Sequence, residues 1–354
     1  MRILHTYCLN YNIGDYALGI GVKNLLRKYL DVSYIGNTNL QGREFTSYYI
    51  QEVVNKRFDL LVIGGGGIIH GAHWPNGWFW LIEKDLIKEI KIPFIVYGVG
   101  YNYWKEEGGI PERGIVHLEE TMKQSAYFSV RNDGSQNRLA EQFGKTIPAI
   151  PDPGFHVDID TIYERKEKLP YVLIQLANDK PEKRFGSLKK RESFIAQMKE
   201  VTQKLAKRYK VIFSPHVPED VELSGQIAQG IANTEVWDFG YFAFDHSDEA
   251  VGYYKFAEFV IAMRGHGQIV PIAFNTPVIS LENHPKHRGL MEHLGLIDYN
   301  VSLSKDDYKN EILNKIALVE SNYFEIKEKY SQINKDLRIQ TESAWTEIKS
   351  KITL

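Results

Sequence analysis

Apolar runs alternate with amphipathic segments through the first 155 residues of the chain. Segments rich in apolar residues at 1–9, 58–64 and 92–99 predict buried strands. Residues 126–131 and 146–150 are predicted as further strands, with a helix between them that ends at Gly144. After the first strand, apolar residues spaced by three and four predict a helix with one buried face: Leu18, Val22, Leu25, Leu26 and Tyr29. Such alternation is typical of a parallel sheet covered on both faces.

The same pattern begins again after a charged stretch at 156–170, which we interpret as a linker. Strands are predicted at 171–177, 210–216, 259–263 and 276–281, with a long helix at 190–209 and shorter helices between the later strands. A polar helical segment follows from about Asp306. We therefore predict two doubly wound domains, at 1–160 and 168–305. The tail at 306–354 is expected to pack back on the first domain or to mediate dimers.

Composition narrows the class of protein. A chain of 354 residues suits two domains, and a net charge of −2 gives no basic field for nucleic acid. One cysteine, Cys8, excludes a disulfide framework and a cysteine-based zinc site. No apolar run is long enough to span a membrane, and the N-terminus does not resemble a signal peptide. We expect a cytoplasmic protein, with peripheral association at the inner membrane face as an alternative. No motif requires a metal or a resident cofactor.

The apolar run that begins at Val260 is interrupted by Arg264, Gly265, His266 and Gly267. If a strand ends at Met263 and a helix starts near Gly267, then Arg264 and His266 share one side of an extended segment. Ligands of such sheets bind beyond the carboxyl ends of the strands, so both groups are candidate site residues. The alternative is a half-buried histidine beside a structural ion pair.

Four glycines, Gly64 to Gly67, end a predicted strand and are expected to precede a helix. Their backbone amides at a helix start suit an anion, although the spacing matches neither a dinucleotide motif nor a P-loop. Close packing of the backbone is the alternative. Beyond them, His70 is a candidate site residue, and the aromatic stretch at 73–80 could stack on a sugar. We favour a core position for Trp78 and Trp80.

Polar residues follow other strands in the same way. Asn12 and Asp15 come after the first strand, where Asp15 could cap the next helix or take a proton from a hydroxyl. Arg131 ends another strand, with Ser135 at the start of the following helix. A bound anion or an ion pair with Asp133 would each satisfy the guanidinium of Arg131. Asp152 begins a turn that contains proline, and we favour a structural role for it as part of a rigid turn.

Taken in order, these segments resemble the polysaccharide pyruvyl transferase family. The resemblance rests on "NIGD" at 12–15, "VIGGGGII" at 62–69, "SVRNDGS" at 129–135, "PDPGF" at 151–155 and "RGHGQIVPIAFNTPVISL" at 264–281. Two positions depart from the family pattern. Asn132 stands where the family usually has aspartate, and Gly267 stands where it usually has alanine. The fold implied is GT-B-like, with two Rossmann-type domains facing a cleft.

The resemblance implies transfer of pyruvate from phosphoenolpyruvate to a saccharide as a cyclic ketal, in the biosynthesis of capsule or exopolysaccharide. The donor is a dianion, which suits Arg131 and Arg264. Further expected substrate-binding residues are Asn12, Gly65, Gly66, Gly67, Ser135 and Gly267. Protonation of the donor's methylene needs an acid, for which His266 is chosen, and the attacking hydroxyl needs a base, for which Asp15 is chosen. The acceptor could be lipid-linked.

Two other functions fit the same pattern. A GT-B glycosyltransferase that uses a nucleotide sugar would need an acidic residue for the ribose, for which Glu258 and Glu282 are candidates. An inactive member of the family could act as a scaffold in a polysaccharide pathway.

Overall fold

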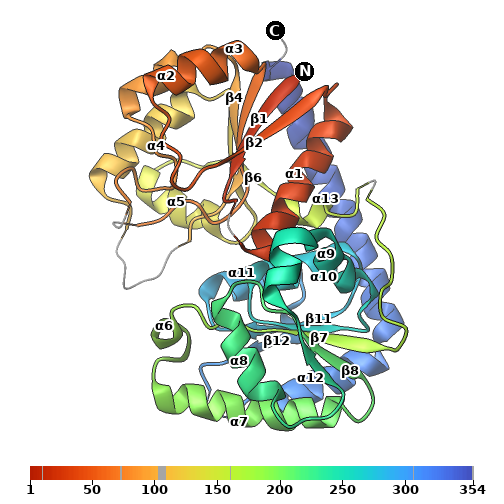
Figure 1. The fold of residues 1–354 in the computed structure, drawn as a ribbon. Helices are drawn as coiled ribbons and strands as arrows, with labels where there is room; N and C mark the ends of the chain where they lie inside the picture. The colour runs from red at the N-terminus through yellow and green to blue at the C-terminus, as the bar shows by residue number, and fades with distance from the viewer. Residues whose placement is uncertain (10, 72–73, 103–108, 160, 306, 353–354) are drawn as a thin grey trace. The chain divides into compact units, whose positions relative to one another are not determined.

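The computed structural model describes residues 1–9, 11–71, 74–102, 109–159, 161–305 and 307–352. The chain divides into two compact units (Figure 1). Unit 1 comprises Met1–Asn10, Leu18–Ile159 and Asp336–Leu354, and unit 2 comprises Tyr11–Ala17 and Asp160–Lys335. The division therefore crosses two helices, α1 (Ile13–Tyr29) and α13 (Tyr323–Ile352). The start of the first predicted helix belongs to unit 2, and the last part of the polar tail belongs to unit 1.

Unit 1 is built on a parallel sheet in the order β2-β1-β3-β4-β5-β6. Its strands are β1 (Arg2–Tyr7), β2 (Tyr34–Asn39), β3 (Leu60–Gly64), β4 (Phe94–Val99), β5 (Tyr127–Arg131) and β6 (Ala149–Ile150). Its longer helices, besides most of α1, are α4 (Glu112–Gln124) and α5 (Ser135–Phe143). Short helical turns complete it: α2 (Ser47–Tyr49), η1 (Ile50–Val54), α3 (Asn55–Arg57), η2 (Lys84–Glu89) and η4 (Pro153–His156).

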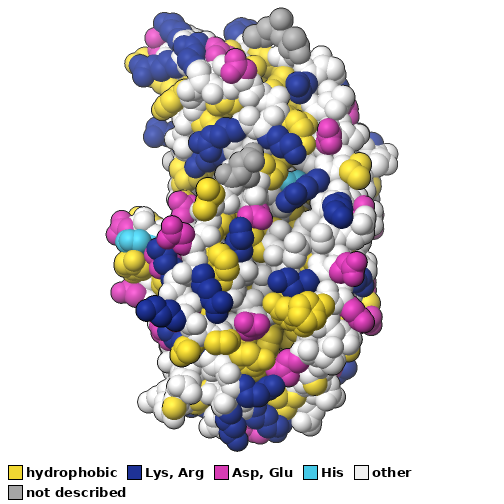
Figure 2. Space-filling model, turned by 90° about the vertical axis from the view of Figure 1, so that its right-hand side faces the viewer, with side chains coloured by type: hydrophobic (Ala, Val, Ile, Leu, Met, Phe, Trp, Pro, Cys, Tyr) yellow, Lys and Arg dark blue, Asp and Glu magenta, His cyan; other side chains and the backbone are white. Residues whose placement is uncertain are grey.

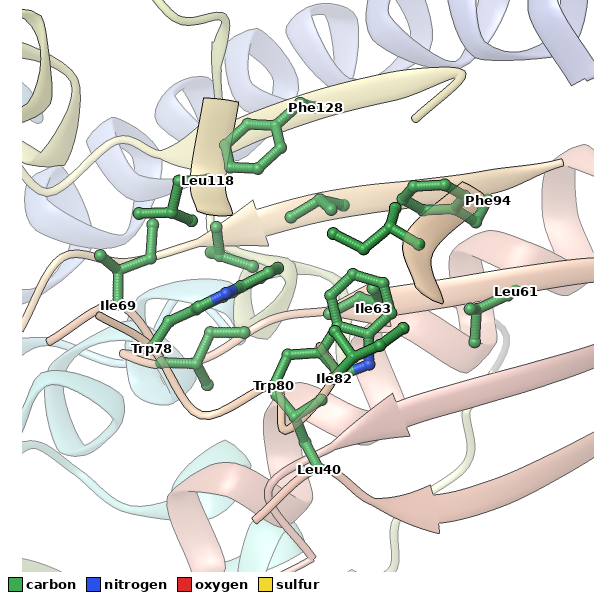
Figure 3. Close-up of a cluster of buried hydrophobic side chains, with 14 of the residues drawn as sticks. Leu40, Leu61, Ile63, Ile69, Trp78, Trp80, Ile82, Phe94, Leu118 and Phe128 are labelled. Carbon is green, nitrogen blue, oxygen red and sulfur yellow. The ribbon is translucent and has the colours of Figure 1, made fainter. Parts of the chain in front are cut away.

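Alternate residues of β3 in unit 1 face two different cores. Leu61 and Ile63 of β3 pack with the residues of α4 and α5, whereas Leu60 and Val62 pack with α1 and the end of α13. Trp78 and Trp80 are fully buried in the first of these cores, as predicted (Figure 3). The sheet is therefore covered on both faces, which explains why its central strands are apolar throughout.

Trp345 anchors the end of α13 to unit 1. Its indole Nε1 donates to the hydroxyl of Tyr97 at 3.0 Å, and its ring stacks on Tyr29. The earlier part of the same helix belongs to unit 2, where Asn334 donates to the carbonyl of Ile272 at 2.7 Å. Each part of α13 thus completes the core of its own unit.

Unit 2 repeats the architecture, with the strand order β12-β11-β10-β7-β8-β9 and all pairs parallel. The strands are β7 (Tyr171–Gln175), β8 (Lys210–Phe213), β9 (Thr234–Val236), β10 (Val260–Ala262), β11 (Val278–Glu282) and β12 (Asn300–Ser302). The helices are α6 (Pro181–Phe185), α7 (Leu188–Leu205), α8 (Glu219–Ala228), α9 (Ser247–Phe256), α10 (Gly265–Ala273), α11 (Pro285–His293) and α12 (Lys309–Ser321), with the short turns η5 (Tyr241–Asp245) and η6 (Ile297–Tyr299). The predicted class, parallel α/β in both halves, is confirmed.

The surface carries charges of both signs. On the face drawn in Figure 2, Lys and Arg side chains are mixed with Asp and Glu, in keeping with the net charge of −2. No helix among the described residues is both long and apolar enough to cross a membrane.

Three histidines of unit 1 are buried and should make its stability depend on pH. Burial lowers the pKa of His5 and His156 to about 3 and that of His117 to about 4. An unfolded histidine titrates near ~6.5, so the unfolded chain binds more protons between these values. Stability should be complete above the unfolded pKa and fall as the pH drops toward 4, by up to about 1.4 kcal/mol per pH unit for each histidine.

Urea denaturation at a series of pH values between about 7 and 5 checks this expectation. His156→Gln removes one titrating group and should reduce the slope of stability against pH. A free energy of unfolding that stays constant over this range would contradict the argument.

Candidate active site

The residues predicted for the site fall into two polar clusters, one in each unit. Arg131, Ser135 and the glycines after β3 belong to unit 1. Asn12, Asp15, Arg264, His266 and Gly267 belong to unit 2. The catalytic pair predicted from the sequence therefore shares one unit.

In unit 1, Arg131 is already paired with two carboxylates. Its Nε donates to Asp133 at 2.7 Å and its Nη1 donates to Asp152 at 3.0 Å, and all three side chains are buried. Burial opposes the charge, but the two carboxylates raise the pKa of Arg131 above its ordinary value. The ion-pair interpretation thus describes Arg131, and Asp152 acts as one of its partners as well as a turn residue.

Ser135 and Asn132 hold this pair in place. The hydroxyl of Ser135 donates to Asp133 and accepts from the backbone N–H of Tyr101 at 2.8 Å. Asn132 accepts from the backbone N–H of Asp152 at 3.0 Å through its Oδ1. An aspartate oxygen could accept the same bond, so the departure from the family pattern keeps this contact.

The glycines after β3 make room for neighbours and do not start a helix. In the described part of 68–83, the chain forms no helix; Ile69 pairs with Trp78 as an antiparallel bridge instead. Gly65 has a φ of +78°, and a Cβ there would lie 2.0 Å from Leu18. A Cβ on Gly67 would lie 3.4 Å from a guanidinium nitrogen of Arg131. The expected helix start at these glycines is wrong, and with it the helix-dipole argument for an anion at Gly65, Gly66 and Gly67.

In unit 2, α10 begins at Gly265, two residues earlier than expected. Arg264 is the extended N-cap residue, with φ −110° and ψ 149°, whereas His266 already lies in the first helical turn. The spacing suggested that the two side chains share one side of an extended segment, and this prediction is wrong because only Arg264 is extended. Both side chains still lie close enough to His216 to lower its pKa.

Arg264 is the centre of a partly buried ion-pair network. Its Nε and Nη2 donate to the two oxygens of Asp220, at 2.8 and 2.6 Å, and Nη2 also reaches Asp179. Asp179 in turn pairs with Arg184 at 2.8 Å. Although burial opposes ionisation, Arg264 and Arg184 hold the pKa of Asp179 below its ordinary value. Two arginines and two aspartates thus neutralise one another.

Asp220 has further ties to the backbone. It is fully buried in the first turn of α8 and accepts backbone N–H groups from Asn178, His216 and Val217. A carboxylate with this many donors fixes the loops that end β7 and β8 relative to α10. The sequence argument did not single out Asp220, Asp179 or His216, although His216 follows β8 at the same kind of strand end as the residues that were chosen.

The start of α1 lies against His266. Asn12 caps this helix, since its Oδ1 accepts from the N–H of Gly14 at 2.8 Å, so the cap is Asn12 and not Asp15. A Cβ on Gly14 would lie 2.8 Å from both Cβ and Nδ1 of His266. The N–H of Ile13 donates to the carbonyl of His216 at 3.2 Å. The first turns of α1 and α10 therefore meet at the imidazole of His266, with Asp15 in the first turn of α1.

His216 is buried beside the start of α1. Its Nε2 lies 2.6 Å from the hydroxyl of Tyr254, and both groups are buried. Burial, together with the charge of Arg264 and the neighbouring His266, lowers the pKa of His216 well below its ordinary value. His216 is therefore neutral near neutral pH.

Gly267 is explained by packing. A Cβ there would lie 2.7 Å from Oε1 of Gln175, the atom that accepts the backbone N–H of Arg264 at 2.8 Å. Glycine in place of the family's usual alanine thus leaves room for Gln175. Near the same turn, Lys286 has its Cε 4.0 Å from a Cβ placed on Gly265, and His287 is buried. His70, in unit 1, stacks on Phe79 with ring centroids 4.5 Å apart.

The comparison with known families agrees with the ordered motifs. The family model described as "Polysaccharide pyruvyl transferase" matches residues 12–285. The chain belongs to this family. The match includes every residue placed in the two clusters above, and it confirms the resemblance that the sequence indicated.

Solved structures of low sequence identity share the fold of this pyruvyl transferase family member. A putative UDP-N-acetylglucosamine 2-epimerase from Listeria monocytogenes has a TM-score of 0.57 at 11% identity, covering 94% of this chain and 90% of that one. The UDP-GlcNAc 2-epimerase from Neisseria meningitidis, solved with UDP-GlcNAc, has a TM-score of 0.53 at 14% identity, covering 97% and 99%. No curated protein sequence matches significantly. The fold is thus a GT-B-like α/β fold, as expected.

Proposed function

We propose that this protein transfers pyruvate from phosphoenolpyruvate to a saccharide as a cyclic ketal, in the assembly of a surface polysaccharide. Membership of the polysaccharide pyruvyl transferase family supports a transferase that acts on saccharides. The donor and the ketal are the finer part of the proposal. They rest on the chemistry that the unit 2 cluster can perform, without a cofactor.

The observation that carries the proposal is the meeting of two helix starts at His266. The first turns of α1 and α10 meet there, so the positive ends of two helix dipoles lie near the same place. The N–H groups of Ile13 and Gly14 are already bonded to His216 and Asn12, so the backbone amides for an anion would come from the start of α10. Phosphoenolpyruvate carries a phosphate and a carboxylate, and both are stabilised in such a position. The imidazole of His266 lies at this point, where it could donate a proton to the bound donor.

The reaction follows from the roles of two side chains. His266 protonates the methylene carbon of the donor, and the adjacent carbon becomes electrophilic. A saccharide hydroxyl attacks that carbon and gives its proton to Asp15. Asp15 passes that proton to the phosphate as it leaves, a second hydroxyl of the same saccharide attacks and gives its proton to His266, and the ring of the ketal closes. Amides of the α10 start stabilise the departing phosphate. The sum is donor plus diol giving ketal plus inorganic phosphate.

Arg131 and Arg264 receive a different role from the one the sequence suggested. Because each guanidinium already faces two carboxylates, neither adds net charge for binding the donor. We propose that Arg264 is a positioning residue that holds the turn before His266. Arg131 does the same for the turns after β5 and β6 in unit 1.

The nucleotide-sugar alternative loses one of its candidates. Glu282 accepts from Asn300 at 2.6 Å and pairs with Arg288 at 3.0 Å, so its oxygens are engaged within the protein. A ribose would have to displace these partners.

Mass spectrometry of a panel of saccharides incubated with phosphoenolpyruvate tests the proposal. A gain equal to pyruvate minus one water supports it, whereas thermal stabilisation by UDP or GDP alone, with no such product, would overturn it.

A further inference from the structure

Two aromatic rings stand exposed beside the cap of α1. Tyr11 is 60% exposed and Phe244 is 57% exposed, and their ring centroids lie 4.3 Å apart at an interplanar angle of 45°. Both residues belong to unit 2. Aromatic side chains of this size are normally buried for most of their area, so an exposed pair in contact needs a reason.

A further exposed aromatic side chain lies on η5 (Tyr241–Asp245), the element that carries Phe244. Tyr241 is 43% exposed and stacks on His246, with centroids 3.7 Å apart and planes within 7°. The element that carries Tyr241 and Phe244, η5, is a single turn of π-helix. Such turns are rare and are frequent at functional sites. We call the side chains of Tyr11, Tyr241, Phe244 and His246 the aromatic platform.

The aromatic platform adjoins the residues proposed to carry the reaction. Tyr11 directly precedes Asn12, which caps α1 next to His266. Tyr16, one turn into α1, donates from its hydroxyl to Asp248 at 2.9 Å, which ties this helix to the start of α9 just after η5. The rings and the proposed active site are thus held by the same elements of unit 2.

The charges around the platform select among occupants. The segment at 237–249 contains Asp238, Asp245, Asp248 and Glu249 but no lysine or arginine. Asp245 and Asp248 are exposed. Carboxylates repel phosphate groups and anionic lipid, but they accept hydrogen bonds from hydroxyls. Flat apolar rings beside carboxylates fit a neutral molecule with an apolar C–H face and a rim of hydroxyls.

We propose that the aromatic platform binds a pyranose ring of the saccharide acceptor, with Tyr11 and Phe244 stacked against its C–H face. Asp245 and Asp248 accept hydrogen bonds from the sugar hydroxyls. The inference rests on the proposed function, to which it adds the place where the acceptor is held. The platform sets acceptor binding, while the anionic donor binds at the helix starts.

Saturation-transfer NMR with the methyl glycosides of glucose, galactose and mannose tests the platform without any turnover. The expected result is transfer to the ring C–H protons of at least one glycoside, lost in Tyr11→Ala and Phe244→Ala. Tyr11→Phe and Phe244→Tyr keep a flat ring and should keep the transfer. Phe324→Ala is the matched control, because Phe324 is an 84% exposed aromatic of the same unit, and it should behave as the unchanged protein.

Kinetics with an accepted saccharide give the second readout. Removal of one ring should raise the acceptor KM about tenfold, with the KM for phosphoenolpyruvate unchanged. Equal transfer in the alanine variants, or no transfer to any glycoside in the unchanged protein, would overturn the platform. Loss of transfer in the variants of a protein that never releases phosphate would leave the platform standing and overturn the proposed function alone.

Discussion

His266→Ala is expected to reduce phosphate release from phosphoenolpyruvate by about 10² to 10⁴-fold, the contribution typical of a positioned general acid. His266 lies where the first turns of α1 and α10 meet, which is the place proposed for the donor. Its neighbour His216 is the closest candidate to replace it as an acid, but burial lowers the pKa of His216 well below its ordinary value. Phosphate release with a coupled colour assay measures the effect.

Two further variants test whether a lower rate of phosphate release is caused by the loss of the imidazole of His266. His293→Ala, which changes an exposed histidine of the same unit, should leave the rate unchanged. Gly14→Ala should lower the rate without removing the imidazole, since a Cβ there would lie 2.8 Å from Nδ1 of His266 and displace it. If His266→Ala retained the rate and lost several degrees of melting temperature instead, His266 would be a packing residue.

The apolar runs predicted the buried strands because both faces of those strands are covered. β3 and β4 are apolar at every position, and this pattern is visible in the sequence. β2 was missed because it lies at the edge of its sheet, where only Gly36 is buried and the other residues carry no apolar run. The edge strand β12 was missed because it has only three residues, and Val301 is its one apolar residue.

The strand-end rule predicted which residues gather, but not what each of them contacts. Asn12, Arg131 and His266 do lie at the ends of parallel strands or at the helix starts that follow them. The sequence spacing could not reveal that Arg264 meets Asp220 and Asp179, because these partners are 44 and 85 residues away along the chain. The start of α1 contacts His216 through Ile13 and His266 through Gly14, and these partners are also far away along the chain.

Arg264→Leu is expected to lower the free energy of unfolding by about 3–5 kcal/mol, the cost typical of breaking a buried ion pair from one side. Asp220 is fully buried, and its two oxygens would lose both charged donors. Arg264→Lys should cost less but still destabilise, because an ammonium cannot reproduce the two-pronged contact of Nε and Nη2. Urea denaturation followed by circular dichroism measures the change.

The neighbouring charges give the matched comparisons. Arg288→Leu removes an exposed pair with Glu282 and should cost at most about 1 kcal/mol. Combining Arg264→Leu with Asp220→Asn should recover part of the loss, since the uncharged amide oxygen can still accept backbone N–H groups and no buried carboxylate is then left without its cation. If Arg264 bound phosphoenolpyruvate directly, Arg264→Lys would weaken the binding of this donor and leave the free energy of unfolding unchanged. If Arg264 is a positioning residue, Arg264→Lys lowers the free energy of unfolding. The rate then falls as well, because Asp220 no longer holds the turn that carries His266.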